Sequence, residues 1–319
     1  MSEPQLLVLN RADLERLELT WDEIIDVLDD AFLQKSRGLV QNPPKPKVVP
    51  REDAFVNAMP AYLGGSDGLG IKWVSGHEQN SAKGLPYIFG SLLMNDADTG
   101  RPLALVDGGW VTEMRTPGAS GVTMRHVPGS PTRVGIVGCG VQGRRHLEVT
   151  LAVHPGIEEV VAFDHRMENV QEVFDLADGR RTTFVSSPEE TLEGVDIAIT
   201  CITRALEPKL DAANTSADAL LLPVDYDDAM AAPAFSGASI YVVDDHDQYA
   251  AVAARGHYFQ GLPEPTAELA DVVSGGVSVP EHGRRMFLNM GIAMDDIALG
   301  QLVLARAEER GVGQRVAFP

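Results

Sequence analysis

The chain has 319 residues, 44% of them hydrophobic and 23% charged, so it is long enough for two globular domains. Its formal net charge of −20 argues against nucleic acid as a partner, because most of the surface would repel a polyanion. No apolar run approaches the roughly 20 residues of a membrane span, and the first residues lack the pattern of a signal peptide. Cys139 and Cys201 form no CxxC pair, and we expect buried, reduced thiols. We therefore expect a cytoplasmic protein with small-molecule partners.

The first part of the chain mixes helical and strand-like patterns. A helical pattern over residues 11–36 is interrupted at Thr20, which forms the signature of a capping box together with Glu23. The stretch "NPPKPKVVP" ends the helix, and strand-like runs follow at residues 54–59, 69–75, 87–94 and 102–107. The turn "NDADTG" between the last two runs predicts a hairpin. This part of the chain is expected to form a strand-rich α+β domain.

The pattern changes after about residue 125. Apolar runs without alternation, typical of strands that are buried on both faces, occur at residues 134–137, 160–163, 182–185, 197–200, 220–224 and 240–243. Helix-like segments separate most of them, which predicts an α/β domain with a Rossmann-type doubly wound parallel sheet. A last amphipathic pattern, over residues 292–309, ends at Gly311 and is expected to pack on the first domain. The predicted domains are therefore residues 1–125, completed by 291–319, and residues 126–290.

The segment "TRVGIVGCGVQGRRHLEVT" carries the strongest functional motif. Gly138, Gly140 and Gly143 have GxGxxG spacing between a predicted strand and a predicted helix. In such a loop the first glycine permits a tight turn, the second lets the backbone approach a pyrophosphate, and the third allows close packing of helix on strand. The N-terminus of the helix adds partial positive charge. The motif therefore predicts a dinucleotide-binding loop.

The following strand predicts which dinucleotide is bound. It ends in Asp164, which lies 21 positions after Gly143, close to the spacing expected for a ribose ligand. This carboxylate would bind both ribose hydroxyls of NAD and repel the additional phosphate of NADP. His165 and Arg166 follow directly, and their basic side chains oppose that preference. We expect NAD as cofactor, with NADP as the alternative and Arg166 as a further contact.

Residues 70–120 narrow the class of enzyme. The stretches "GIKWVSGHEQN" and "GLPYIFGSLLMNDADTGRPLALVDGGWVTEMRTPGAS" resemble the ornithine cyclodeaminase/mu-crystallin family, and "GCGVQG", "LLPVDYDD" and "GIAMDD" follow in the order of that family. The resemblance spans nearly the whole chain. It implies an enzyme of amino acid metabolism that is a homodimer built through the strand-rich, substrate-binding domain. Members include ornithine and lysine cyclodeaminases, an archaeal alanine dehydrogenase and ketimine reductases.

The resemblance also implies roles for single residues. Lys72 matches a ligand of the substrate carboxylate, Arg115 a clamp that touches both substrate and cofactor, and Asp225 the catalytic aspartate. Lys72 is further expected to lie near Arg115 in a partly dry cleft, which would lower its pKa and let it share in proton transfer. The remaining matches are cofactor contacts at Val141, Gln142 and Thr203 and a substrate-pocket residue at Met290.

Several positions depart from the family pattern. An arginine of the family is absent from "KPKVVP", which suggests Lys47 as a second carboxylate ligand. Tyr87 replaces a common threonine and is expected to reshape the nicotinamide end of the cofactor site. Pro117 replaces an alanine and is expected to kink its helix. The stretch "VDYDDAMAAPAF" around Asp225 has no basic residue, which argues against ornithine cyclisation.

These residues predict an NAD(P)-dependent oxidoreductase that moves hydride between nicotinamide and the α-carbon of a small amino or imino acid. Arg115 and Lys72 would position the substrate carboxylate, and Asp225 would move the proton. One alternative is a cyclodeaminase of a diamino acid that recycles NAD within the site, and another is a non-catalytic protein that binds cofactor or a small ligand. His246 in "VVDDHDQ" is interpreted as a solvated strand end, and no metal site is expected.

Overall fold

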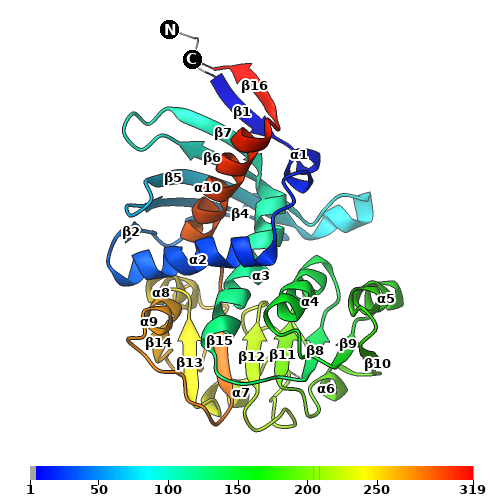
Figure 1. Cartoon of the computed structure of the whole chain (residues 1–319). Helices are drawn as coiled ribbons and strands as arrows, with labels where there is room; N and C mark the ends of the chain where they lie inside the picture. The colour runs from blue at the N-terminus through cyan, green and yellow to red at the C-terminus, as the bar shows by residue number, and fades with distance from the viewer. Residues whose placement is uncertain (1–4, 204, 208, 319) are drawn as a thin grey trace. The chain divides into compact units, whose positions relative to one another are not determined.

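Figure 1 shows the computed structural model of the chain, which describes residues 5–203, 205–207 and 209–318. The chain divides into two compact units, Met1–Arg115 with Gly291–Pro319 and Thr116–Met290. The sequence pattern places the boundary at residue 125, because the helix α3 (Gly108–His126) runs through the division without a break in its pattern. The helix continues through Pro117, and the kink expected there stays a prediction. Among the described helices, none is long and apolar enough to cross a membrane.

The described part of the first unit contains an eight-stranded sheet, in the order β16-β1-β7-β6-β5-β4-β2 with β3 paired to β4. The predicted hairpin around "NDADTG" is confirmed, since β6 and β7 pair in antiparallel fashion. The strands are β1 (Gln5–Leu9), β2 (Val40–Gln41), β3 (Lys47–Val48), β4 (Ala54–Leu63), β5 (Gly68–His77), β6 (Ile88–Asn95), β7 (Pro102–Asp107) and β16 (Gln314–Ala317).

The described part of the first unit also contains helices, of which α10 lies against one face of the sheet. They are α1 (Arg11–Glu15), α2 (Trp21–Ser36), the 3-10 helix η1 (Glu78–Lys83) and α10 (Ala293–Arg310). The predicted capping box at Thr20 is confirmed, and α10 ends as predicted at Gly311 in the left-handed conformation. Helix α10 contacts β4, β5, β6 and α2 (Figure 1). The C-terminal segment therefore completes the core of the first unit, as its apolar pattern predicts.

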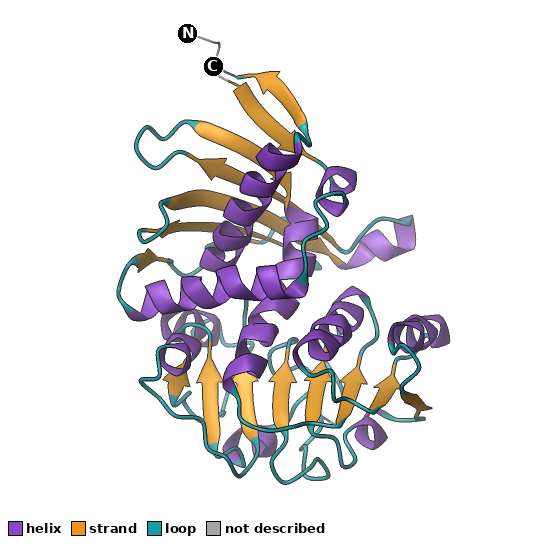
Figure 2. Cartoon of the chain, in the orientation of Figure 1, coloured by secondary structure: helices purple, strands orange, loops and turns teal. Residues whose placement is uncertain are grey.

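The described part of the second unit contains an eight-stranded parallel sheet, in the order β10-β9-β8-β11-β12-β15-β13-β14. Figure 2 shows its strands pointing the same way. The predicted Rossmann-type sheet is confirmed. Its strands are β8 (Arg133–Val137), β9 (Glu159–Phe163), β10 (Arg181–Phe184), β11 (Ile197–Thr200), β12 (Leu220–Pro223), β13 (Ile240–Val243), β14 (Ala267–Glu268) and β15 (Arg285–Leu288).

Helices lie on both faces of the parallel sheet. A side chain added at Gly143 of α4 would meet Ile136, whereas one added at Gly135 would meet Thr191 of α6. Because neighbouring residues of a strand point to opposite faces, α4 and α6 cover opposite sides of β8. The helices of this unit are α4 (Val141–Val153), α5 (Met167–Leu176), α6 (Pro188–Thr191), α7 (Ala232–Ser236), α8 (His246–Ala253) and α9 (Leu269–Val273).

The strand β15 was not predicted. It lies between β12 and β13 in the sheet although it follows β13 by about forty residues in the chain. Its four residues run directly into the segment before α10, so the sequence there reads as one continuous apolar region. The sheet thus takes its last central strand from a segment whose own pattern does not separate it from the C-terminal helix.

Candidate active site

The glycine-rich loop of the second unit has the geometry of a dinucleotide cradle. Gly138 has a φ of +92°, and a Cβ there would lie 2.5 Å from the carbonyl oxygen of Cys201. A Cβ at Gly143 would lie 2.1 Å from the carbonyl oxygen of Gly138, so helix and loop can approach this closely only without a side chain. A Cβ at Gly140, by contrast, would have no atom within 4 Å. The loop is thus tight on its protein side and open over Gly140.

Helix α4 begins at this opening. Its N-cap is Gly140, which provides no side-chain hydrogen bond to the first turn, and the first turn has no acidic residue. A helix start of this kind offers backbone N–H groups and partial positive charge to an anion. Val141 is 47% exposed at the same end. The loop and the start of α4 therefore fit the pyrophosphate of a dinucleotide.

Asp164 follows β9 and is held in place by three donors. Its carboxylate accepts hydrogen bonds from the backbone N–H of Cys139 at 2.9 Å, the backbone N–H of Arg166 at 2.8 Å and the Nδ2 of Asn169 at 3.1 Å. The bond from Cys139 ties this acid directly to the glycine-rich loop. Asn169 was not predicted, because its role depends on the turn between β9 and α5. This arrangement fits an acid that receives ribose hydroxyls.

Asp225 lies just beyond the carboxyl end of β12. Its carboxylate accepts hydrogen bonds from the Oγ1 of Thr200 at 2.8 Å and from the backbone N–H of Ile202 at 3.0 Å, both at the end of the neighbouring strand β11. Burial raises the pKa of Asp225 to about 7, and the nearby Asp228 adds to this rise while the two hydrogen bonds oppose it. A fixed carboxyl group that titrates near neutrality is suited to proton transfer.

The first unit contains a buried cluster of charged groups. The Nζ of Lys72 on β5 lies 2.5 Å from the Oδ1 of Asp296 on α10, and the Nε of Arg115 on α3 lies 3.3 Å from the same oxygen. Lys72 and Asp296 are fully buried, and Arg115 is 7% exposed. Two cations therefore share one carboxylate oxygen. The buried Nη1 of Arg115 has no hydrogen-bond acceptor among the residues that the structure describes.

Opposing effects set the pKa of Lys72. Burial lowers its pKa to about 7, the carboxylate of Asp296 opposes this effect, and the positive charges of Arg115 and Lys45 reinforce it. The predicted lowering of this pKa is therefore confirmed. A bound anion would favour the charged form of Lys72. Asp296 was not assigned a role, although the motif "GIAMDD" contains it.

Lys45, which the sequence did not single out, lies with this cluster. It is 9% exposed, and its Nζ donates a hydrogen bond to the carbonyl oxygen of Gly291 at 2.9 Å. Lys47, the predicted second carboxylate ligand, is instead exposed on β3, and its Nζ lies 5.6 Å from the centre of the Phe55 ring. Lys45 precedes the short strand β3, whereas Lys47 is its first residue, and the sequence that the two lysines share does not reveal which of them is buried.

The other residues predicted to contact cofactor or substrate are divided between the two units. Thr203 and Arg166 are exposed, after β11 and at the start of α5 respectively. Tyr87 is 37% exposed and packs edge-on against Phe55, with ring centres 6.5 Å apart. Met290 is 5% exposed and belongs to the hydrophobic core of the second unit. The roles of these residues stay predictions, as does that of Gln142 at the start of α4.

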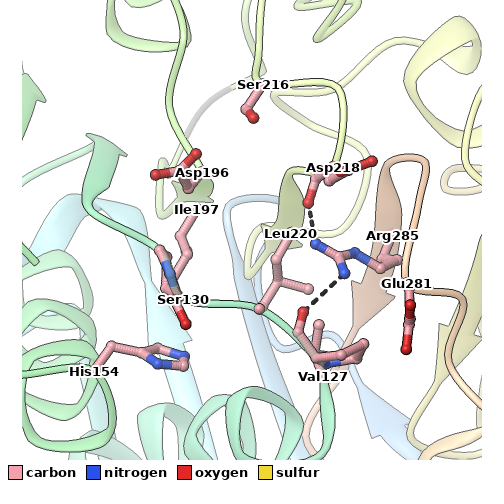
Figure 3. Close-up of a pocket in the computed structure, with 13 residues that line it drawn as sticks. Val127, Ser130, His154, Asp196, Ile197, Ser216, Asp218, Leu220, Glu281 and Arg285 are labelled. Carbon is pink, nitrogen blue, oxygen red and sulfur yellow. Dashed lines mark hydrogen bonds between the residues drawn. The ribbon is translucent and has the colours of Figure 1, made fainter. Parts of the chain in front are cut away.

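A pocket of about 250 Å³ lies at the other edge of the parallel sheet, where the strands begin (Figure 3). Its charged groups hold turns together. Asp196 accepts hydrogen bonds from the backbone N–H groups of Thr132 and Arg133, and Arg285 donates to the carbonyl oxygens of Pro128 and Asp218. Ligands of open parallel sheets bind at the carboxyl ends of the strands. This pocket is therefore distinct from the cofactor edge.

No group of three metal-ligating side chains occurs among the described residues.

Comparison with known proteins places these features in context. The model of the ornithine cyclodeaminase/mu-crystallin family matches residues 5–311. The nodulation efficiency protein NfeD of Rhizobium meliloti is 28% identical over 316 residues, which cover 97% of this chain and 98% of that protein.

Two solved structures resemble the whole chain. The Δ1-pyrroline-2-carboxylate reductase of Thermococcus litoralis, in complex with NADH and L-proline, has a TM-score of 0.86 and 30% identity, and the match covers 98% of this chain and 100% of that one. An archaeal alanine dehydrogenase dimer with bound NAD has a TM-score of 0.85 and 25% identity, with 99% and 100% covered.

Proposed function

The chain belongs to the ornithine cyclodeaminase/mu-crystallin family, and we propose that it is an NAD(P)-dependent oxidoreductase acting on a small amino or imino acid. The bound nicotinamide would supply or accept a hydride at the α-carbon of this substrate. The observation that carries the proposal is the buried cluster in which Lys72 and Arg115 share one oxygen of Asp296. The glycine-rich loop and Asp164 support NAD as the cofactor, with NADP as the alternative.

The cluster is proposed to bind the substrate carboxylate. Arg115 offers a buried Nη1 that has no acceptor among the described residues, so an incoming carboxylate would satisfy a donor that is otherwise costly to bury. Lys72 would become fully charged as the anion arrives, because its pKa of about 7 lies within reach of a small electrostatic change. We assign the third contact to Lys45 in place of Lys47, since Lys45 is buried with the cluster.

Asp225 is proposed to move the proton. In the direction of amino acid oxidation its carboxylate would accept a proton from the substrate nitrogen or from an attacking water, and in imine reduction its carboxylic acid would return one. A pKa of about 7 makes both protonation states available at neutral pH. The hydrogen bonds from Thr200 and Ile202 would hold the carboxyl group still during both steps.

A substrate panel tests the proposal. Purified protein with NAD(H) or NADP(H) would be incubated with amino acids, and with keto acids plus amines, while nicotinamide absorbance and released ammonia are followed separately. A net change in nicotinamide supports an oxidoreductase. Ammonia release without such a change identifies a cyclodeaminase, and bound cofactor with neither signal identifies a binding protein. Either of the last two results contradicts the proposal.

The variant Arg115→Leu is expected to lower kcat/KM for the substrate found in the panel by roughly 10- to 150-fold, the value of one or more charge-assisted hydrogen bonds. Arg101→Leu, at an exposed turn of the same unit, is the matched control and should change kcat/KM less than twofold. Circular dichroism verifies that both variants are folded. Unchanged turnover in folded Arg115→Leu would remove the carboxylate clamp from the proposal.

We also propose that the enzyme is a homodimer formed through the uncovered face of the first unit's sheet. Trp73, Phe89 and Leu105 are 51%, 47% and 37% exposed. They lie on neighbouring strands at alternate positions to Lys72, Leu92 and Val106, which are buried on the covered face. Exposed aromatic and aliphatic side chains gathered on one sheet face are typical of an association surface. The dimer of the related alanine dehydrogenase is consistent with this assignment.

Light scattering after size exclusion tests the dimer. Trp73→Glu is expected to convert dimer to monomer at micromolar concentration, because it would bury a charge in the centre of the interface. Phe184→Glu, a 48% exposed residue on β10 of the second unit, is the control and should leave the dimer intact. A monomeric parent protein, or a dimeric Trp73→Glu variant, would refute this interface.

A further inference from the structure

Asn57 lies on the same sheet face as Lys72, and no role has been given to it so far. The two residues belong to adjacent antiparallel strands, in which Met59 pairs with Lys72 and Asn57 pairs with Val74. Side chains of paired residues lie on the same face, and so do those of residues two apart. Asn57 is therefore a diagonal neighbour of Lys72, at the roughly 7–8 Å backbone spacing that longer side chains can bridge.

The side chain of Asn57 has an unsatisfied acceptor. Its Oδ1 is buried and has no hydrogen-bond partner among the residues that the structure describes, although the residue as a whole is only partly buried. Burying an acceptor without a donor destabilises the folded protein, because the acceptor loses its hydrogen bonds to water. Lys72 does not supply the missing donor, since its ammonium group binds Asp296. The acceptor thus fits a donor that comes from a ligand.

The neighbouring cluster indicates what that donor is. If Lys72 and Arg115 bind a substrate carboxylate, the next polar atom of the same substrate is the nitrogen, which is bonded to the carbon adjacent to the carboxylate. An α-amino acid carries N–H donors on that nitrogen, and so does a protonated imino acid. A keto acid offers only acceptors there and would leave the Oδ1 of Asn57 unpaired. Sites with a buried hydrogen-bonding group discriminate strongly against ligands that lack its partner.

We propose that Asn57 is a specificity-determining residue that accepts a hydrogen bond from the α-nitrogen of the substrate. This inference rests on the proposed function of the cluster as a carboxylate site. It assigns to β4 the recognition of nitrogen and to Arg115 and Lys72 the recognition of the acid. The substrate class is thereby restricted to acids that carry an N–H at the α-carbon.

Calorimetric titration of the NAD-saturated protein with matched acids tests the proposal. The pairs are L-alanine and propanoate, L-proline and cyclopentanecarboxylate, and L-ornithine and 5-aminopentanoate, whose members differ in the α-nitrogen. The parent protein is expected to prefer the amino acid in each pair that binds. Asn57→Leu should weaken amino acid binding by roughly 5- to 100-fold, which corresponds to the value of one buried hydrogen bond, and should change binding of the nitrogen-free acid less than twofold.

Two further variants control the result. Asn57→Asp keeps an acceptor oxygen at this position and should retain the preference for the amino acid. Asn95→Leu, an asparagine on β6 whose Nδ2 bonds the carbonyl oxygen of Gly100, should leave both affinities unchanged. Because Asn57→Leu removes an unsatisfied acceptor, its thermal midpoint should not fall.

The outcomes separate this inference from the proposed function. If acids bind and the preference for nitrogen persists in Asn57→Leu, the role of Asn57 is refuted and the carboxylate site stands. If no acid of any pair binds the parent protein, or if Arg115→Leu binds them all equally well, the carboxylate site itself is refuted and the inference fails with it.

Discussion

Replacing Asp225 by asparagine is expected to reduce kcat by roughly 10²- to 10⁴-fold, the contribution of a general acid or base, while the affinity for NAD remains within threefold of the parent value. Asparagine preserves the volume of the side chain and an oxygen for the hydroxyl of Thr200, but it can neither accept nor release the proton. The measurement is steady-state kinetics with the substrate found in the panel, combined with NAD titration.

The pH profile adds a second readout for this variant. In the parent protein the rate of amino acid oxidation should rise with pH through about 7 as Asp225 ionises, and the rate of imine reduction should fall over the same range. In Asp225→Asn this limb, the change of rate with pH near 7, should be absent from the pH profile of kcat. Lys72 titrates in the same range, but its charge acts on carboxylate binding, so its effect is expected in KM.

Stability should also respond to this substitution in a pH-dependent way. Burial raises the pKa of Asp225 to about 7, so between pH 4 and 7 the folded state holds a proton that the unfolded state has lost. Raising the pH through this window therefore lowers the stability contributed by Asp225. Asparagine does not ionise, so the variant does not lose this stability. The thermal midpoint of Asp225→Asn relative to the parent should rise between pH 4 and 7 and then level off.

Asp228→Asn is the matched control for these experiments. Asp228 lies in the same turn and raises the pKa of Asp225 through its charge, but no hydrogen bond joins it to Thr200 or Ile202 in the structure. It should keep kcat within a fewfold of the parent and move the pH limb to lower pH. Equal losses of kcat in both variants, or full activity in Asp225→Asn, would contradict the assignment of the proton to Asp225.

Replacing Asp296 by asparagine is expected to destabilise the protein by roughly 3–5 kcal/mol, the usual cost of removing one partner of a buried ion pair. Asp296 is fully buried and is the carboxylate that contacts both Lys72 and Arg115. The carboxylate of Asp296 opposes the effect of burial, which lowers the pKa of Lys72. Without this carboxylate the pKa should fall further, and Lys72 should lose its charge at neutral pH. Urea unfolding measures the loss, and substrate KM should rise in parallel.

Two comparisons sharpen this prediction. Glu309→Gln removes a carboxylate that is 76% exposed on the same helix and 3.4 Å from Arg306, and a surface pair of this kind contributes at most about 1 kcal/mol. The double variant Lys72→Met, Asp296→Leu replaces the buried pair by apolar groups and should recover most of the stability without recovering carboxylate binding. A stable Asp296→Asn variant with normal KM would show that the cluster does not depend on this acid.

The sequence by itself determined the features that depend on neighbours in the chain. The capping box joins Thr20 to Glu23, three residues apart. The glycine-rich loop follows its strand directly, and Gly143 is required by the carbonyl of Gly138 in the same loop. The buried parallel strands can be recognised in the sequence as unbroken apolar runs. Family motifs located Lys72, Arg115 and Asp225, whose roles remain to be tested.

Only the tertiary structure decided which distant residues meet. Lys72 and Asp296 are separated by 224 positions, and Lys45 and Gly291 by 246. Nothing in the local pattern distinguishes Lys45 from Lys47, because which lysine is buried depends on the elements that pack around each of them. In the same way Thr200 becomes the partner of Asp225 only when β11 and β12 pair in parallel. Local sequence specifies elements and turns, whereas burial and ion pairing depend on how those elements pack, and it is this packing that sets the pKa values of Lys72 and Asp225.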